Sequence, residues 1–321
     1  METIISTDIQ QAKSLLQADE LIAIPTETVY GLAGNALSTP AIKKIYEVKK
    51  RPYHNPLIVH LYESSQIQQY TESPSEMGIY LLKKYSPGPL TVIFQKNSLI
   101  PDIVTAGMNQ VALRIPKHPI TLALLSELEF PIAAPSANPF GYISPTTPAH
   151  VLQQLGSTIP FILDGGPCQK GVESTVISAS DNQIIVHRLG AFDIDLLFEE
   201  DPNLVILNHE TGKLTSPGML KQHYSPRTRL HIYPTQFKAE EHSHLKIGFI
   251  GFTTIPSDLP IAHSIVLSKE GDLDEAAFHL YDALHRLDAM QLDLILIETV
   301  PSKGLGMAIN DRINRAVAKF I

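Results

Sequence analysis

The sequence predicts an α/β protein with a mixed N-terminal sheet and a second, smaller α/β domain. Helical and strand patterns alternate along most of the 321 residues, as expected when helices cover the faces of a sheet. The connections at 164–167 and 180–182 are too short for a helical crossover, so they indicate antiparallel strands. Periodicity fades between Asp201 and Arg229. We therefore expect domains at 1–205 and 230–321, joined by a linker at 206–229.

The first elements set the pattern of the N-terminal domain. Thr7 and Gln10 are typical of a capping box before an amphipathic helix. Thr39-Pro40 supplies an N-cap and a proline at the first helical position of the next helix, which carries Lys49 and Arg51 to its C-terminal end. The remaining elements expected in this domain are strands at 21–24, 56–60, 90–94, 111–115, 131–134, 161–163, 174–177 and 184–188, and helices at 75–85, 120–128 and from 147.

The C-terminal region repeats the alternation on a smaller scale. We expect strands at 245–252, 261–267 and 292–298 and helices at 273–290 and 307–320. This order predicts a small α/β domain.

Composition limits the classes of function. The formal net charge of -8 and a pI near 5.9 argue against tight RNA binding over a broad surface. The single Cys168 rules out an intramolecular disulfide and suits a reducing compartment. We expect a cytoplasmic protein with no membrane segment, because no run of about 18 apolar residues and no basic leader occur.

A cationic site is expected where the predicted strands end. Five Lys or Arg between Lys43 and Arg51 face only Glu47, against the acidic balance of the chain. Arg114 and Arg188 also lie at the ends of predicted strands, where a rigid element can aim a guanidinium at an anion. Each cation alone is more often a surface ion pair or a partner of a helix dipole. Together they predict an anion cavity.

Other motifs give weaker evidence of function. The run from Gly304 to Ile309 lacks the third glycine and the acidic residue of a dinucleotide fingerprint. The pair His242 and His244 has no evident further ligand, so we predict no protein metal site. Cys168 has no histidine base beside it in the sequence and is expected to be an incidental thiol.

Several motifs together resemble one family. The runs Pro25-Thr-Glu-Thr-Val-Tyr-Gly-Leu32 and Lys49-Lys-Arg-Pro-Tyr-His-Asn-Pro-Leu-Ile-Val-His60 are similar to those of the YrdC family, and the later runs agree: Ser86-Pro-Gly-Pro-Leu-Thr91, Arg114-Ile-Pro116, Pro135-Ser-Ala-Asn138, Glu173-Ser-Thr175 and His187-Arg-Leu-Gly190. The C-terminal third, entered through Ser216-Pro-Gly-Met219 and His223-Tyr-Ser-Pro226, resembles the two-domain form of threonylcarbamoyl-adenylate synthase. The resemblance implies a YrdC-like twisted mixed sheet with helices around a cationic cavity, plus a Rossmann-like C-terminal domain.

The resemblance also implies roles for particular residues. Lys49 and Arg51 correspond to catalytic cations. The positions that correspond to L-threonine contacts are Thr28, His60, Arg114, Ala134 and Ser174. The positions that correspond to ATP contacts are Arg51, Asn55, Gln110, Ser136, Ser144, Arg188 and Tyr224. Three positions depart from the family: Lys50 stands where glycine is usual, Ala134 where a hydroxyl residue is common, and Gln110 where threonine is frequent.

The implied activity is synthesis of threonylcarbamoyl-AMP from L-threonine, bicarbonate and ATP, with release of pyrophosphate. The product would serve modification of the adenosine beside the anticodon of tRNA. Mg²⁺ is expected to accompany ATP, with unknown ligands, and the expected partner is the downstream tRNA threonylcarbamoyl-transferase. Two alternatives stay open: an RNA-binding or ribosome-maturation module of the same fold, and a small-molecule hydrolase.

The linker is expected to act as a lid. Amino-acid carbamates decompose in water, so the site must exclude solvent. Pro217 and Pro226 restrict the chain, Gly218 permits a sharp turn, and Tyr224 offers a flat ring with a polar tip. A passive tether would explain the prolines and the glycine, but not Tyr224. We therefore predict that the linker folds back over the site, with Tyr224 at the nucleotide.

Overall fold

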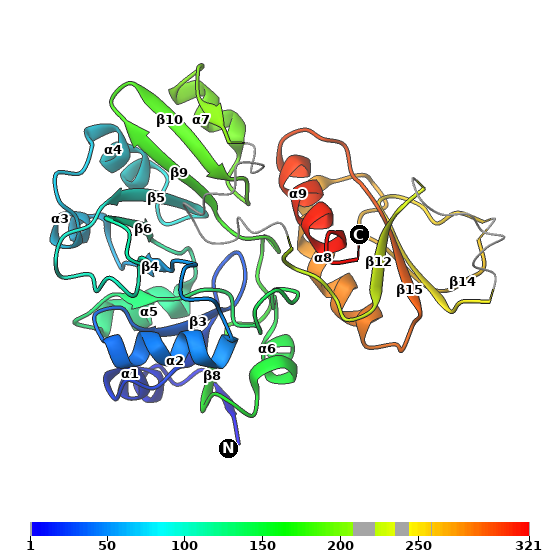
Figure 1. Ribbon diagram of the computed structural model, residues 1–321, viewed down its shortest axis with the longest axis horizontal. Helices are drawn as coiled ribbons and strands as arrows, with labels where there is room; N and C mark the ends of the chain where they lie inside the picture. Colours follow the sequence, from blue (N-terminus) through cyan, green and yellow to red (C-terminus); the bar gives the residue numbers. More distant parts are fainter. Residues whose placement is uncertain (1, 208–221, 235–243, 258, 321) are drawn as a thin grey trace.

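The chain forms two sheets with helices packed against them (Figure 1). The structure is a computed structural model and describes residues 2–207, 222–234, 244–257 and 259–320. Residues 208–221 of the predicted linker, which include Pro217 and Gly218, lie outside this part of the chain. None of the described helices is long and apolar enough to cross a membrane.

The larger sheet is mixed, as predicted. Only the connection at 180–182 joins antiparallel neighbours, however, because β8 and β9, on either side of 164–167, lie in different parts of the sheet and do not pair. Its strand order in the described residues is β1-β8-β2-β3-β7-β4-β6-β5-β9-β10-β11. The strands are β1 (Ile4–Ser6), β2 (Ile22–Ile24), β3 (Gly31–Asn35), β4 (Ile58–His60), β5 (Leu90–Gln95), β6 (Gln110–Arg114), β7 (Ile132–Ala133), β8 (Phe161–Leu163), β9 (Thr175–Ser180), β10 (Gln183–Arg188) and β11 (Val205–Ile206). The β9–β10 hairpin is antiparallel, whereas β4 pairs parallel with β6 and β5 with β9.

Helices pack around this sheet (Figure 1). They are α1 (Ile9–Gln17), α2 (Thr39–Lys49), the 3-10 turn η1 (Ser64–Gln66), α3 (Ile67–Tyr70), α4 (Glu76–Lys84), α5 (Pro119–Glu127), α6 (Pro148–Leu155) and α7 (Ile194–Glu200). Two caps differ from the prediction by one residue, because Asp8 rather than Thr7 caps α1 and Ser38 rather than Thr39 caps α2. In both cases the side chain accepts a hydrogen bond from the backbone N–H three residues on.

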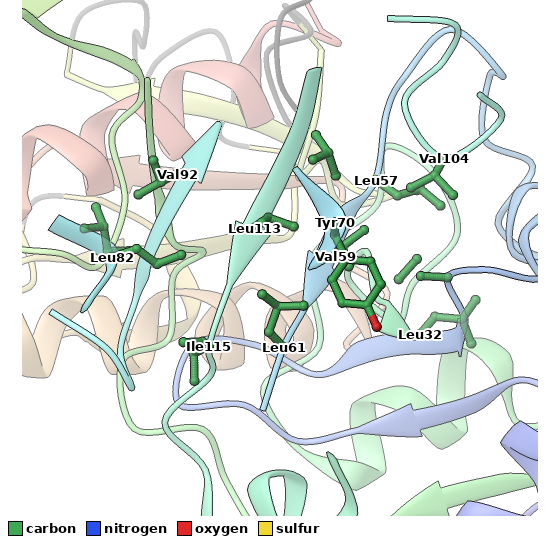
Figure 2. Packing of buried hydrophobic residues seen from close by; sticks show 14 of the residues in the cluster. Leu32, Leu57, Val59, Leu61, Tyr70, Leu82, Val92, Val104, Leu113 and Ile115 are labelled. Atoms are coloured by element: carbon green, nitrogen blue, oxygen red, sulfur yellow. The ribbon is translucent and has the colours of Figure 1, made fainter. Parts of the chain in front are cut away.

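Alternation along the central strands separates the main core from the opposite face of the sheet. Val59, Leu61, Leu113 and Val92 join one buried cluster (Figure 2). Their neighbours in the chain point to the other face, since successive side chains of a strand alternate. That second face is where the cationic residues appear.

The second sheet is parallel, with order β12-β15-β13-β14. Its elements are β12 (Arg229–Tyr233), β13 (Ile247–Gly251), β14 (Ile261–Val266), α8 (Leu273–Asp288), β15 (Leu294–Glu298) and α9 (Leu305–Val317). Figure 1 shows α8 and α9 on the side of this sheet that faces the first domain. One hydrophobic cluster joins Val29, Ile143 and Val172 to residues of α8 and α9, so the two domains share buried surface.

The end of α2 explains one departure from the family pattern. Lys50 is the C-cap and adopts the left-handed conformation, with φ 52 and ψ 39. This geometry turns the chain so that Arg51, the next residue, is buried. A left-handed conformation costs an L-residue about 1–2 kcal/mol, which accounts for glycine as the usual residue here.

Lys50→Gly is therefore expected to stabilise the protein. The relief of strain exceeds the entropy cost of glycine, about 0.5–1 kcal/mol, and leaves a gain of about 0.5 kcal/mol in the free energy of unfolding. Denaturant titration measures this change. Lys50→Ala is the control, because it removes the charge but keeps the strained Cβ; equal stability of the two variants would contradict the explanation.

Candidate functional site

A cavity lies beyond the ends of β4 and β6, on the face of the sheet opposite the main core. Its described lining residues are Thr28, Val29, Arg51, Ile58, His60, Arg114, Ala134, Pro135, Ser136, Glu173, Ser174, Arg188, His223 and Tyr224. The cavity volume is about 50 Å³, which leaves room for only a few water molecules. The space left between these side chains is therefore small.

One row of residues across four strands forms the face of the sheet that carries Arg114 and His60. His60 on β4 lies opposite Arg114 on β6, and Arg114 lies opposite Thr91 on β5. Thr91 in turn lies opposite Val176 on β9. Directly opposed residues in neighbouring strands point to the same face and lie about 4.8 Å apart along the row, so the pairing aligns these side chains on the cavity face.

A β-bulge brings Arg188 onto the same face. In β10, Val186 lies opposite Ile177, and both belong to the main core. Strict alternation would point Arg188 into that core as well. The register shifts between Val186 and Arg188, however, and Arg188 lies opposite Val176 instead. Bulges re-aim side chains in this way, and Arg188 becomes part of the cavity.

Arg114 is held by a buried carboxylate. Its Nη2 lies 2.8 Å from Oε1 of Glu27 and donates to Thr28 Oγ1 at 2.9 Å. Glu27 also accepts a hydrogen bond from the backbone N–H of Lys117. Because Glu27 and Arg114 are both buried, the pair fixes the direction of the guanidinium. Sequence reasoning did not single out Glu27.

His60 is neutral at physiological pH. Burial, followed by the nearby Arg114, lowers the pKa of His60 to about 3. Its Nδ1 is buried without a hydrogen-bond partner among the described residues. A buried polar atom of this kind costs free energy unless a ligand pairs with it. His60 can therefore offer a hydrogen bond to a bound molecule without adding charge.

Arg51 is anchored by the loop that follows it. Its Nη2 donates to Asn55 Oδ1 at 2.6 Å and to the Pro56 carbonyl at 2.7 Å, and its Nε donates to the Asn55 carbonyl. Burial lowers the pKa of Arg51 to about 10, so the side chain stays cationic at neutral pH. Asn55 lies behind Arg51 and orients it.

Lys49 lies behind the cavity wall. Its ammonium donates to the carbonyl oxygens of Ser136 and Asn138, and burial lowers its pKa well below the usual value. Lys49 therefore holds the loop that carries Ser136 and does not line the cavity. The predicted catalytic role of Lys49 through direct contact has no support in this placement.

Arg188 and Ser174 form one unit. Arg188 donates from Nε and Nη2 to the Ser174 carbonyl and from Nη2 to Ser174 Oγ. Gly190 lets the chain pass close by, since a Cβ there would lie 2.3 Å from the Glu173 carbonyl oxygen. The glycine of the His187–Gly190 motif is thus required by a close backbone approach.

Two linker residues close the cavity. The rings of His223 and Tyr224 meet edge to face at 4.0 Å, and both side chains are buried. His223 Nδ1 and the Tyr224 hydroxyl lack a hydrogen-bond partner among the described residues. Burial lowers the pKa of His223 to about 3. The sequence-based expectation that Tyr224 lies at the site agrees with this placement.

The structure brings together most of the predicted site residues. Those that line the cavity are Thr28, Arg51, His60, Arg114, Ala134, Ser136, Ser174, Arg188 and Tyr224. Ser144 lies one contact away and donates to Glu173. Gln110 lies outside the site, because it is exposed at the start of β6, about 13 Å along the strand from Arg114. Its predicted ATP contact has no support in this geometry.

Glu173 is the centre of a contact between the domains. It accepts hydrogen bonds from Ser144 Oγ, from the Tyr281 hydroxyl and from Arg312 Nε. Sequence reasoning missed Tyr281 and Arg312. A signal for Arg312 was present, because it falls on the apolar face of α9 with Ile309 and Ala316, and a charged residue there requires a buried partner.

The described residues contain no group of three or more His, Cys, Asp or Glu that could hold a metal ion. Glu173 is the carboxylate among the lining residues, and its oxygens are already paired. The donor set of this part of the chain therefore does not fit a protein-bound Mg²⁺. A Mg²⁺ held by phosphate oxygens and water needs no such set.

Fold and site together define an α/β protein with a YrdC-like domain, whose buried cavity carries three arginines and is closed by a linker tyrosine. Comparisons with known proteins agree with this class. A family profile described as "Telomere recombination" matches residues 14–190, and one described as "Threonylcarbamoyl-AMP synthase, C-terminal domain" matches residues 187–318.

Individual relatives give the same result over nearly the whole chain. The threonylcarbamoyl-AMP synthase of Bacillus subtilis is 39% identical and aligns over 96% of this chain and 92% of its own length. The Schizosaccharomyces pombe synthase is 32% identical over 96% and 87%. A crystal structure of Pyrococcus abyssi Sua5 complexed with L-threonine matches with a TM-score of 0.88 and 33% identity, covering 98% of both chains. The chain belongs to the two-domain threonylcarbamoyl-AMP synthase family.

Proposed function

We propose that this protein makes threonylcarbamoyl-AMP from L-threonine, bicarbonate and ATP, with release of pyrophosphate. The observation that carries the proposal is the convergence of Arg51, Arg114 and Arg188 in one buried cavity. Arg114 already pairs with Glu27, but three guanidinium groups around one small cavity favour an anionic ligand there. An amino-acid carboxylate and a triphosphate supply the required charge.

The threonine subsite is assigned to the end of the cavity around Arg114. Arg114 is fixed by Glu27 and Thr28, so its remaining N–H groups can pair with the amino-acid carboxylate. Neutral His60 lies beside it in the strand row. The Pyrococcus abyssi relative was crystallised as a complex with L-threonine, which supports a threonine subsite in this chain. Ala134 offers only a methyl group to this subsite.

The nucleotide subsite is assigned to the side of Arg51, Ser136, Arg188 and Tyr224. Arg51 and Arg188 can neutralise charge that develops on the phosphates. Catalysis would then consist of positioning and charge stabilisation, with no covalent enzyme intermediate. The carbamate oxygen of carboxylated threonine attacks the α-phosphorus, and pyrophosphate leaves with the electrons of the broken P–O bond. Mg²⁺ would enter with ATP and spread the phosphate charge.

Closure by the linker fits the chemistry. A carbamate decomposes in water, and a cavity of about 50 Å³ holds little water. ATP does not fit into that volume, so His223 and Tyr224 have to move outward for ATP to bind, and the linker would then close over the bound nucleotide in a more open position than the one described. We also propose that the product passes to a tRNA threonylcarbamoyl-transferase, because an acyl adenylate is an activated donor.

A pyrophosphate assay tests the proposed function. Release of pyrophosphate from ATP should require both L-threonine and bicarbonate, and omission of either should abolish it. Release that is independent of threonine would indicate a hydrolase instead. Micromolar RNA binding that weakens steeply with salt, without any synthesis, would favour the RNA-binding alternative.

Arg114→Ala is expected to raise the threonine KM by about 10- to 100-fold and change the ATP KM by less than about twofold, because Arg114 is a binding contact for the carboxylate. Initial rates at varied threonine and ATP measure both constants. Loss of Arg114 leaves Glu27 buried without its cation, which can destabilise the fold. Arg114→Lys keeps the charge and is the matched control. An unchanged threonine KM with a raised ATP KM would show that the subsites are reversed.

A further inference from the structure

A buried cluster links α8 and α9 to the cavity. Arg312 of α9 is 1% exposed although it is charged. Its Nε lies 2.7 Å from Glu173 Oε2, and its Nη2 donates to the Leu189 carbonyl at 2.8 Å. Its Nη1 pairs with Asp311. The C-terminal domain thus places a guanidinium against two segments of the first domain.

The same guanidinium contacts the linker. The central carbon of Arg312 lies 5.1 Å from the centre of the Tyr224 ring, within the range of a cation–π contact. The Tyr281 ring stacks on Tyr224 at 5.8 Å with an interplanar angle of 27°. Tyr281 also donates to Glu173. The ring that closes the cavity is therefore held by two side chains of the C-terminal domain.

Glu173 connects Arg312 and Tyr281 to the residues of the cavity wall. It accepts from Ser144 Oγ at 2.6 Å, and it directly precedes Ser174, whose carbonyl and hydroxyl hold Arg188. Burial alone would raise the pKa of Glu173, but Arg312 and Arg188 lower it to about 2. Glu173 thus remains ionised across the physiological range, and its pairing with Arg312 does not depend on pH there.

An ion pair that only stabilised the contact between the domains would not need to touch the cavity wall and the Tyr224 ring. The domains also contact through a pair at the exposed rim, Lys170 with Asp274 at 2.7 Å. That pair touches neither the cavity lining nor Tyr224, and such exposed pairs contribute little. Among the interdomain contacts described here, the Glu173–Arg312 pair differs from the rim pair because it touches both the cavity wall and the linker ring.

We propose that Glu173 and Arg312 form a positioning pair through which the C-terminal domain sets Tyr224 and Arg188 against the nucleotide. This inference rests on the function proposed above. Arg312 itself does not touch the reacting atoms. The C-terminal domain is accordingly a part of the nucleotide site and not only the anchor of a tether.

Four variants of the full chain test the positioning pair: Arg312→Met, Glu173→Gln, the double variant Glu173→Gln/Arg312→Met, and the rim control Asp274→Asn. Each single variant of the pair is expected to lower kcat/KM for ATP by about tenfold or more. The dissociation constant for threonine, measured calorimetrically without ATP, should change by less than about twofold. Asp274→Asn should leave both constants within about twofold.

The double variant separates positioning from folding. Loss of one partner leaves an uncompensated buried charge, whereas loss of both removes that penalty, so thermal stability should recover toward that of the parent chain. The ATP defect should persist, because Tyr224 and the Leu189 carbonyl still lack the Arg312 guanidinium. Recovery of kcat/KM together with stability would overturn the proposal, and so would an equal weakening of threonine and ATP binding.

A readout without turnover distinguishes failure of this inference from failure of the proposed function. Backbone amides of the linker bond to the Gly141 and Arg315 carbonyls, so hydrogen exchange at residues 222–228 reports linker position. Exchange should be faster in Arg312→Met than in the parent chain and Asp274→Asn. If the parent chain releases no pyrophosphate, the proposed function is wrong. The hydrogen-exchange measurement still tests whether the Glu173–Arg312 pair positions the linker. Unchanged exchange would overturn the positioning role.

Discussion

Arg51→Ala is expected to lower kcat/KM for ATP by about 100- to 1000-fold, the usual cost of removing one preorganised donor from a site of developing charge. Arg51 lines the cavity and is fixed by Asn55 and the Pro56 carbonyl, so no other described cation can take its place without a rearrangement of the loop. Steady-state pyrophosphate release at saturating threonine measures the effect.

Folding has to be measured beside activity in this variant. A cation at a helix end contributes at most about 1 kcal/mol to stability, but Arg51 is buried and donates three hydrogen bonds. Leaving their acceptors unpaired costs about 1–3 kcal/mol, so assays belong well below the melting temperature of the variant. Lys50→Ala removes the neighbouring exposed charge and should retain activity within about twofold. Near-normal turnover by folded Arg51→Ala would remove Arg51 from the site.

A chain that ends at Leu207 is expected to lose synthesis by at least about 100-fold, or to consume ATP with poor yield of product. The truncation removes Tyr224, which closes the cavity, and Arg312, which pairs with Glu173. An open cavity would admit water and let the carbamate decompose. The measurement compares pyrophosphate released with threonylcarbamoyl-AMP formed.

The fold of the truncated chain needs its own measurement. The larger sheet is complete at β11, but Val29, Ile143 and Val172 would lose their apolar partners in the second domain. Circular dichroism and thermal melting should therefore accompany the assay. Tyr224→Ala in the full chain is the matched control, since it removes the ring and keeps the interface. Full coupled activity from a folded truncated chain would mean that the linker is only a tether.

Local sequence signals predicted most of the elements that the structure describes. Apolar periodicity identified α2, α4, α8 and the strands of the central sheet, because burial of one face imposes that pattern. The prediction omitted several elements, among them β1, α7 and β12. It also omitted β3, whose sequence Gly-Leu-Ala-Gly-Asn has low strand propensity. This strand forms between β2 and β7, which pair with it on both sides. A short stretch of sequence does not show which distant strands will pair with it.

Most of the site residues were also predicted from the sequence, but their individual roles were not. The motif residues that end strands, such as His60 and Arg114, do meet in the cavity. The prediction could not separate residues that line the cavity from those that support it, and it grouped Lys49 and Asn55 with the first set. Whether a cation faces a ligand or a backbone carbonyl depends on the loop opposite, here the one that carries Ser136.

The sequence by itself determined the two-domain α/β plan, the strand-end motifs and the family, because these depend on periodicity and on short runs of neighbouring residues. Only the tertiary structure decided how charges are paired and aimed. Arg188 reaches the cavity because of a bulge in the β9–β10 pairing. The negative charge of Glu173 is balanced by Arg312, 139 residues away in the sequence. A buried charge is tolerated only with a partner in place, and a local pattern indicates which face of an element is buried but not which distant side chain will meet it there.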